Sequence, residues 1–445
     1  MHDQPIHRIV NLLPLSRRVP EGVGRADVES ALFDDPGALR SLPGPFAVVA
    51  RRGTDVRLAR SLDRPLRYFL AKEGAGPYLV IAERIDEIRS QLEVEGHAWQ
   101  FHPTYTRMVP AHHVTQLQLI GCPDPSPRHH RFFAPAKDVL PEDTSLIGSR
   151  YIGVLKREID AWIAALPAEA PIGVLFSGGI DSGAVLLAAV RALLDAGQTA
   201  ARLKAFTLTV DGGGSDLEQA REFLSRVDLA YLHEELGVEA GAIDALEAVE
   251  VIEDYKPLDV ECAAVNLAAL AAIRERYPDW RYLLDGDGGD ENLKDYPIEE
   301  NRELTIRSVV TNSLLYHEGW GVDALKHSQT YSGGLSRGYV RTCAPQRRYD
   351  FEGFSPFTRP AVIEIAEGIP FDALTRGDVD ALYALKGDVV RAGVADVLGF
   401  DMPIFEKCRF QDGAVGGTLF ADRDGTAPDL YRNHLLARYE APAGP

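Results

Sequence analysis

The sequence lacks an apolar run long enough to cross a bilayer, which argues against a membrane protein. A transmembrane helix needs about 20 consecutive apolar residues, and no such run occurs among the 445 residues. The N-terminal segment MHDQPIHRIVNLLPLSRR also lacks the basic start, apolar centre and small-residue cleavage site of a secretory signal. We therefore expect a cytoplasmic protein with no membrane partner.

The sequence has few cysteines, and acidic residues outnumber basic ones. The 4 cysteines lie far apart with no Cys-x-x-Cys pair, which favours reduced thiols over a disulfide framework or a zinc site. The formal net charge of -19 at pH 7 would repel a polyanion, so broad binding to DNA or RNA is disfavoured. We expect small-molecule partners and no nucleic acid, and the composition leaves assembly into a homo-oligomer open.

The length and the spacing of apolar residues predict two domains. A chain of 445 residues exceeds what one hydrophobic core usually organises. Residues 44–92 alternate apolar and polar positions between Gly and Pro, which predicts an antiparallel β-rich domain at residues 1–135. Within it, residues 63–71 read as turn-like. A proline-rich linker at 122–143 leads to the second domain, residues 136–445.

In the second domain, strand-like runs alternate with helix patterns. The strands are expected at residues 171–176, 203–210 and 280–286, with helices at 184–197 and 216–227. This alternation predicts a parallel sheet with crossover helices, whose ligands bind outside the carboxyl ends of the strands. The rest of the chain reads as a mainly helical extension. The expected fold class is therefore α/β plus α+β.

The most specific motif is Ser-Gly-Gly-Ile-Asp-Ser, between a strand and a helix. Gly178 and Gly179 let the backbone turn tightly, so that several N–H groups point at one anion and the helix N-terminus adds positive charge. The hydroxyls of Ser177 and Ser182 can donate hydrogen bonds to phosphate, while Asp181 can hold Mg2+ against the same oxygens. The chain lacks the GxxxxGK[ST] loop of kinases. The motif predicts a site for ATP and Mg2+.

This motif resembles the pyrophosphate loop of the ATP pyrophosphatase (PP-loop) superfamily, in which ATP is cleaved between the α and β phosphates. Other segments resemble the asparagine synthetase family, including the β-lactam and carbapenam synthetases. The run LLDGDGGDE stands where those proteins have a Gly-x-Gly-x-Asp loop after a core strand. The resemblance implies an adenine nucleotide α-hydrolase-like fold, with Gly286 at the nucleotide and Asp290 as the second magnesium ligand. Asp181 and Asp290, at two strand ends, also suit Mg2+ on general grounds.

Two later segments resemble further loops of this family. FEGFSPF is similar to its Glu-x-x-x-Pro-Phe segment, which implies that Glu352 lies near the reacting centre. FEKCRFQDG is similar to its lysine loop, which implies that Lys407 stabilises the negative charge that develops as pyrophosphate leaves. Lys386 and Arg391 match a family helix more weakly, and we interpret them as structural or phosphate-adjacent.

Asp287 departs from the family pattern. Lactam-forming relatives have a tyrosine here, paired with the glutamate that matches Glu352, and asparagine synthetases have a glutamate. Three roles stay open. Asp287 and Glu352 form a carboxylate pair that accepts the proton of the attacking amine, or Asp287 binds Mg2+ or a cationic substrate group, or it is an inert loop residue.

The first domain resembles the class II glutamine amidotransferase, or Ntn-hydrolase-like, domain at Asp63, residues 65–68 and Ala82-Glu83. A glutaminase of that class needs an N-terminal cysteine, whose thiol attacks the amide. This chain begins Met1-His2, and its first cysteine is Cys122. We therefore expect a degenerate domain without glutaminase activity.

Together these features predict an ATP-dependent synthetase that adenylates a carboxylate, releases pyrophosphate and couples the acyl group to an amine. The amine belongs to the same molecule, as in lactam formation, or is a separate amine or ammonia. We expect a role in specialised metabolism such as antibiotic biosynthesis. The alternatives are an ammonia-dependent asparagine synthetase and a non-catalytic scaffold of the same fold. An RNA-modifying relative is opposed by the acidic charge.

Overall fold

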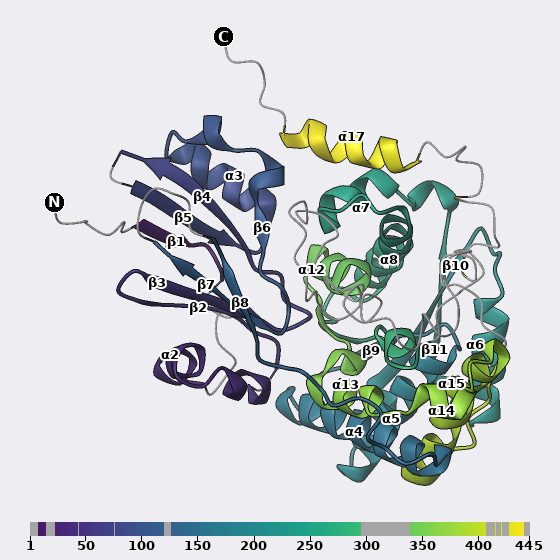
Figure 1. Ribbon diagram of the computed structural model, residues 1–445. Helices are drawn as coiled ribbons and strands as arrows, with labels where there is room; N and C mark the ends of the chain where they lie inside the picture. The colour runs from purple at the N-terminus through teal and green to yellow at the C-terminus, as the bar shows by residue number, and fades with distance from the viewer. Residues whose placement is uncertain are drawn as a thin grey trace.

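The computed structural model (Figure 1) describes most of the chain. The described residues are 8–14, 23–42, 44–74, 76–119, 126–294, 339–405, 414, 420 and 427–439.

The N-terminal part forms two four-stranded sheets. The first has the order β1 (Arg8–Asn11), β5 (Gly76–Ala82), β4 (Arg67–Glu73), β6 (Arg107–Met108). The second has the order β2 (Ala47–Arg52), β3 (Asp55–Arg60), β7 (His113–Gln118), β8 (Arg128–Arg131). All neighbouring strands are antiparallel except β1 and β5, which run parallel.

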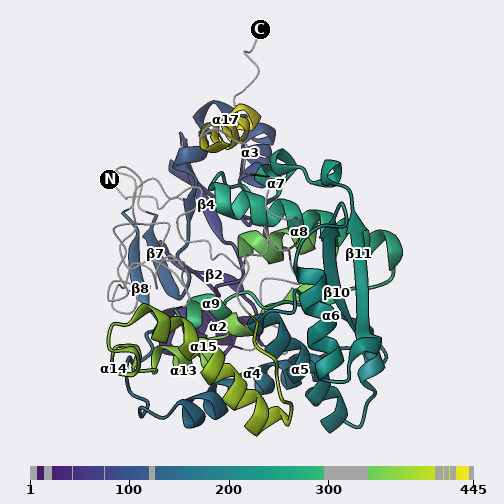
Figure 2. The same ribbon diagram turned by 90° about the vertical axis from the view of Figure 1, so that its right-hand side faces the viewer.

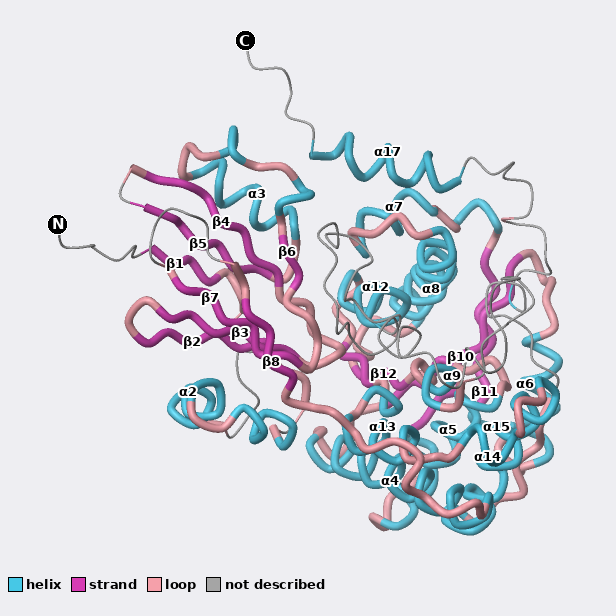
Figure 3. The backbone as a smooth tube through the Cα atoms, in the orientation of Figure 1, coloured by secondary structure: helices cyan, strands magenta, loops and turns pink. Residues whose placement is uncertain are grey.

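The two sheets stack as a sandwich between two helices, as Figure 3 shows in magenta and cyan. Helix α2 (Arg25–Phe33) packs on β2 and β3, and α3 (Ile85–Val94) packs on β5 and β4. Residues 63–71, expected to be turn-like, instead become strand β4 from Arg67 onward. Tyr68 packs between the sheets and Phe69 packs toward α3, so both faces of the strand are buried. A strand buried on both faces lacks the alternation by which sequence reveals it.

The C-terminal part contains a five-stranded sheet in which every pair is parallel, which confirms the parallel-sheet prediction. Its order is β11 (His233–Val238), β10 (Leu203–Val210), β9 (Ile172–Leu175), β12 (Tyr282–Leu284), β13 (Glu352–Phe354). One face packs on α4 (Thr144–Ala165), α5 (Ile180–Asp195), α6 (Asp216–Arg226) and α15 (Val379–Gly393). The other packs on α8 (Pro257–Arg276).

Shorter helices complete the C-terminal part. They are α7 (Ala245–Ile252), α9 (Gly289–Asn292), α12 (Ala344–Arg348), α13 (Pro360–Glu367), α14 (Phe371–Thr375) and α17 (Ala427–Tyr439). In Figures 1 and 2, α17 lies beside both α3 of the sandwich and α7. Among the described helices, none is long and apolar enough to cross a membrane.

Glu253 joins the sandwich, the C-terminal part and α17. It follows α7 with a φ of 51° and is buried. Its carboxylate accepts hydrogen bonds from the backbone N–H of Ile85 at 2.8 Å and of Asp86 at 3.2 Å, at the start of α3. It also accepts one from the Tyr439 hydroxyl at 3.1 Å and forms an ion pair with buried Arg67 at 3.5 Å. One carboxylate thus satisfies donors from three separate elements.

We expect Glu253→Ala to destabilise the protein by about 3–5 kcal/mol, because removing one partner leaves the other charge of a buried pair uncompensated. Denaturant unfolding measures this loss. Glu93→Ala is the matched control, since Glu93 forms an exposed pair with Arg89 one helical turn away and should cost less than about 0.5 kcal/mol. Equal losses for the two variants would contradict the role given to Glu253.

Candidate active site

The predicted phosphate-binding residues form one turn, called here the serine turn (residues 177–182), which follows β9 and includes the first residues of α5. The Oγ atoms of Ser177 and Ser182 lie 3.2 Å apart, and the N–H of Gly179 donates to Ser177 Oγ at 3.3 Å. Gly178 has a φ of 76°, and a Cβ there would lie 2.8 Å from the backbone nitrogen of Ala220. Only glycine fits this conformation and this close approach without strain.

The second predicted loop, the aspartate loop (residues 285–290), follows β12 and packs directly against the serine turn. The two loops are neighbours because β12 pairs with β9 in the sheet. A Cβ on Gly289 would lie 2.1 Å from Asp181 Oδ1, and a Cβ on Gly286 would lie 2.8 Å from the backbone nitrogen of Ser182. The glycines therefore let the two loops come together at the carboxyl edge of the sheet.

Lys386 joins the two loops. Its side chain, on α15, is only 2% exposed, and its Nζ donates to Asp181 Oδ2 at 2.7 Å and also to Asp290 Oδ1. The sequence had indicated only a structural or phosphate-adjacent role for this lysine. The structure places it between the two predicted magnesium ligands, where one ammonium group donates hydrogen bonds to two carboxylates.

The residues of this edge fit a magnesium-bound nucleotide. The side chains of Asp181 and Asp290 are 20% and 37% exposed, and both carboxylates pair with the buried Lys386. Mg2+ is usually bound in proteins by one or two carboxylates together with water and substrate phosphates. In the described ranges no cluster of three or more His, Cys, Asp or Glu side chains is arranged to hold a metal. An ion held here would therefore take further oxygens from phosphate and water.

Asp285 and Asp287 form a carboxylate pair inside the aspartate loop. Asp285 is 1% exposed, and its Oδ1 accepts a hydrogen bond from the N–H of Asp287 at 3.1 Å. Burial raises the pKa of Asp285 to about 6. Burial and the Asp285 carboxylate hold the pKa of Asp287 well above its usual range. At neutral pH such a pair can take up a proton.

Neighbouring side chains fix this pair. Thr342 Oγ1 donates to Asp287 Oδ2, and Gln346 Nε2 donates to Asp285 Oδ2 at 3.2 Å. Gln346 reaches Asp285 because Gly353 on β13 leaves room for its amide. The sequence analysis missed Asp285, although it directly follows a core strand and stands two residues before Asp287.

The structure does not bring Glu352 to Asp287. Glu352 is the first residue of β13 and pairs with Tyr282, at the start of β12. Because the two strands are parallel, Glu352 lies at the amino end of the sheet, and the aspartate loop leaves the carboxyl end. Its side chain is 53% exposed and forms an ion pair with Arg281. The carboxylate partner of Asp287 is therefore Asp285, which corrects the expected pair with Glu352.

The other two cationic residues singled out in the sequence add nothing to the described site. Arg391 is an exposed residue of α15 and pairs with Asp388 at 3.2 Å. Lys407 lies outside the described residues, so its role in stabilising charge stays a prediction.

Comparison with known proteins agrees with this geometry. Residues 159–339 match the family model described as asparagine synthase, and this stretch contains the serine turn and the aspartate loop. Over this stretch the chain is similar to the asparagine synthase family. The protein called asparagine synthetase [glutamine-hydrolyzing] 2 from Lotus japonicus is 30% identical over 217 residues, which cover 47% of this chain and 33% of that protein. The matched region thus spans about a third of that relative's length.

Among solved structures, NAD+ synthetase from Burkholderia pseudomallei aligns at 18% identity with a TM-score of 0.25, covering 58% of this chain and 91% of that chain. A score this low carries no argument about the fold.

We expect Lys386→Met to destabilise the protein by about 3–5 kcal/mol, because two carboxylates are left facing each other without their buried cation. Added Mg2+ should restore part of the loss, since an ion that binds only the folded state stabilises it by about 2.7 kcal/mol at 100 times its Kd. Thermal unfolding with and without MgCl2 measures both effects.

Lys294→Met is the matched control, because it breaks another buried ion pair of the same part of the chain, with Glu367. It should lose similar stability, but Mg2+ should not restore it. Equal restoration of both variants, or of neither, would show that the aspartates do not form a cation site.

Proposed function

We propose that this chain is an ATP-dependent carbon-nitrogen ligase that activates a carboxylate as an acyl-adenylate and transfers the acyl group to an amine. The observation that carries this proposal is the pairing of Asp181 and Asp290 through buried Lys386, beside the serine turn. The match of residues 159–339 to the asparagine synthase family model supports the same conclusion.

In the first step, the substrate carboxylate attacks the α phosphorus of ATP, and pyrophosphate leaves. The N–H groups and hydroxyls of the serine turn are placed to hold the phosphates. Mg2+ held by Asp181 and Asp290 would neutralise charge on the phosphate oxygens. Lys386 supplies a fixed positive charge at the same place. The resemblance of its loop implies a similar role for Lys407 at the departing pyrophosphate.

In the second step, the amine nitrogen attacks the acyl carbon, AMP leaves with the electron pair of the broken bond, and the amine gives up a proton. We assign that proton to the Asp285–Asp287 pair. Their raised pKa values make the ionised pair a better proton acceptor than ordinary carboxylates at neutral pH. Thr342 and Gln346 hold the two carboxylates in place.

An assay of substrate-dependent exchange between ATP and pyrophosphate separates the two steps. With a panel of amino acids and β-amino acid derivatives, we expect exchange by the wild type and a loss of at least about 100-fold in Asp181→Asn and Asp290→Asn, since each removes charge stabilisation of several kcal/mol. Asp287→Asn should keep the exchange and lose amide formation. Asp388→Asn, on the exposed face of α15, is the control. Accumulation of ADP, or no exchange with any compound, would contradict the proposal.

The pair also predicts how amide formation depends on pH. The ionised form is the base, so the rate should rise with pH as the pair loses its proton. Asp285→Asn removes the negative charge that raises the pKa of Asp287, so that pKa falls and the acid limb of the rate profile moves to lower pH. A shift to higher pH, or none, would count against Asp287 as the base.

We also propose where the amine comes from. No cysteine precedes Cys122, so we propose that the sandwich is a degenerate amidotransferase domain. The amine then comes from the substrate itself, as in β-lactam synthetases, or from a second substrate in specialised metabolism in the cytoplasm. Release of glutamate from glutamine would contradict this. A non-catalytic scaffold would bind MgATP without turning it over.

A further inference from the structure

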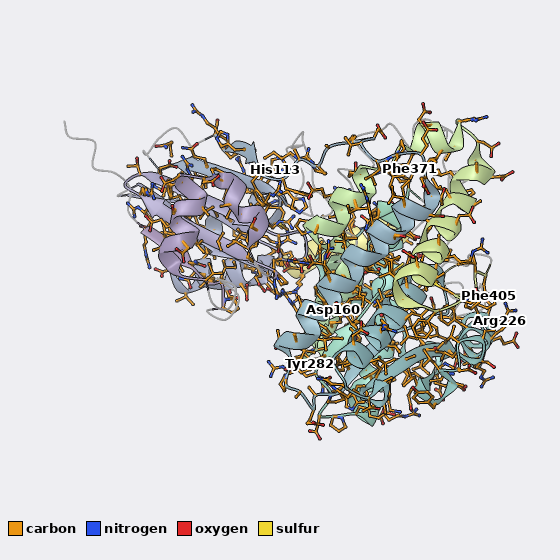
Figure 4. All side chains as sticks on the ribbon, turned by 90° about the horizontal axis from the view of Figure 1, so that it is seen from below. His113, Asp160, Arg226, Tyr282, Phe371 and Phe405 are labelled. Carbon is orange, nitrogen blue, oxygen red and sulfur yellow. The ribbon has the colours of Figure 1, made fainter. Side chains whose placement is uncertain are left out.

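The sandwich carries two acidic residues that no step of the proposed ligase uses. Asp63 and Glu83 belong to the segments that resemble an amidotransferase domain, yet no cysteine precedes Cys122. Both lie where the sandwich meets the C-terminal part, which Figure 4 shows beside it, seen from below. Their contacts there indicate a role other than glutamine hydrolysis.

Glu83 forms an ion pair across this interface. It directly follows β5, its side chain is 6% exposed, and its Oε2 accepts a hydrogen bond from Arg347 Nη1, on α12, at 3.0 Å. A second ion pair of α12, between Arg348 and Glu247, is exposed. Removing one partner of a buried pair leaves a charge uncompensated, which costs far more than the same change in an exposed pair. The contact with Glu83 therefore ties α12 to the sandwich.

The residue before Arg347 holds the aspartate pair. Gln346 is fully buried, and its Nε2 donates to Asp285 Oδ2 at 3.2 Å. Thr342, which donates to Asp287, stands two residues before α12. A displacement of α12 would therefore move a donor of each carboxylate of the pair.

The other end of the aspartate loop has a different support. Asp290 accepts a hydrogen bond from Lys386, on α15, and α15 packs mainly on α4. Helix α12 instead packs on α7 and α8. Because separate helices hold the two ends of the loop, a shift of α12 should disturb the proposed proton acceptor and leave the proposed metal ligand in place.

A loop of the sandwich also approaches the aspartate pair. Buried Arg60 donates hydrogen bonds to three carbonyl oxygens of the loop 61–64, which fixes the loop. The loop lines a small cavity together with residues 358–360, which follow β13. Burial raises the pKa of Asp285 most, and the carboxylate of Asp63 raises it further. The sandwich therefore lies within electrostatic reach of the pair.

We propose that the sandwich, through the ion pair of Glu83 with Arg347, positions the Asp285–Asp287 pair to accept the proton of the attacking amine. Glu83 is then a positioning residue, which acts through α12 and not on the reacting atoms. This inference rests on the proposed ligase function. It gives the sandwich a part in amide formation that needs no glutaminase activity.

The test compares the two half-reactions in the full chain, with the carboxylate and amine that the wild type accepts. Glu83→Gln should keep the exchange between ATP and pyrophosphate near the wild-type rate. It should lower kcat for amide formation about 10- to 100-fold, because misplacing a catalytic group by about 1 Å can cost about 100-fold. Gln346→Leu removes the donor to Asp285 directly and should separate the half-reactions in the same way.

Arg347→Gln provides a further check. If Glu83 and Arg347 act as one unit, each single variant should lose the same activity, and the double variant Glu83→Gln with Arg347→Gln should lose no more than either one. Losses that multiply in the double variant would show that the two residues act independently, which contradicts the proposed contact.

Arg84→Gln is the matched control. Arg84 is the neighbour of Glu83 and also crosses the interface, but it donates to the carbonyl oxygens of Glu250 and Val251 on α7. This variant should lose stability in denaturant unfolding without separating the two half-reactions.

The inference is overturned if Glu83→Gln forms the amide as fast as the wild type, or if Glu83→Gln and Arg84→Gln change both half-reactions alike. Either result leaves the ligase proposal standing, because the wild type still performs both steps. A wild type that shows no exchange, or forms no amide, contradicts the ligase proposal itself.

Discussion

The organisation of the site depends on one buried ammonium group between two carboxylates. Asp181 and Asp290 come from loops after different strands. Because both carboxylates contact the same ammonium group, they lie close together and would repel each other without that cation. Lys386 supplies it from α15, which packs against α4 and α5 in the main core. The free energy gained by burying the apolar side chains of that core offsets the cost of removing the charged lysine from water. Packing in the core around α15 therefore sets the separation of the two aspartates.

The order of the strands in the sheet brings the two loops together. Strands β9 and β12 are distant in sequence but adjacent in the sheet, so the serine turn and the aspartate loop meet at one edge, where open parallel sheets bind their ligands. Glycines at 178, 286 and 289 allow contacts that a Cβ would block. The aspartate loop then serves both half-reactions in the proposed mechanism. Asp290 faces the phosphates, and the Asp285–Asp287 pair takes the proton of the amine.

Sequence reasoning found what local patterns encode. The serine turn, Asp181 and Asp290 were predicted to meet because each follows a strand of a parallel sheet, and the structure brings them together. It undervalued Lys386, because the place of a lysine on a later helix depends on how that helix packs. It misplaced Glu352, because a strand of three residues leaves no readable pattern, and its parallel direction puts Glu352 at the far end of the sheet. The sequence analysis did not predict strand β4, because both its faces are buried and its apolar residues do not alternate with polar ones.

The most direct test of the central claim needs no knowledge of the substrate. Mn2+ can replace Mg2+ and is visible by electron paramagnetic resonance, and coupling to phosphorus reports whether the ion touches bound ATP. The account predicts one phosphorus-coupled Mn2+ per chain in the wild type and its loss in Asp181→Asn and in Asp290→Asn. Unchanged phosphorus-coupled Mn2+ in both variants would contradict it, because the nucleotide and its metal would then be held elsewhere.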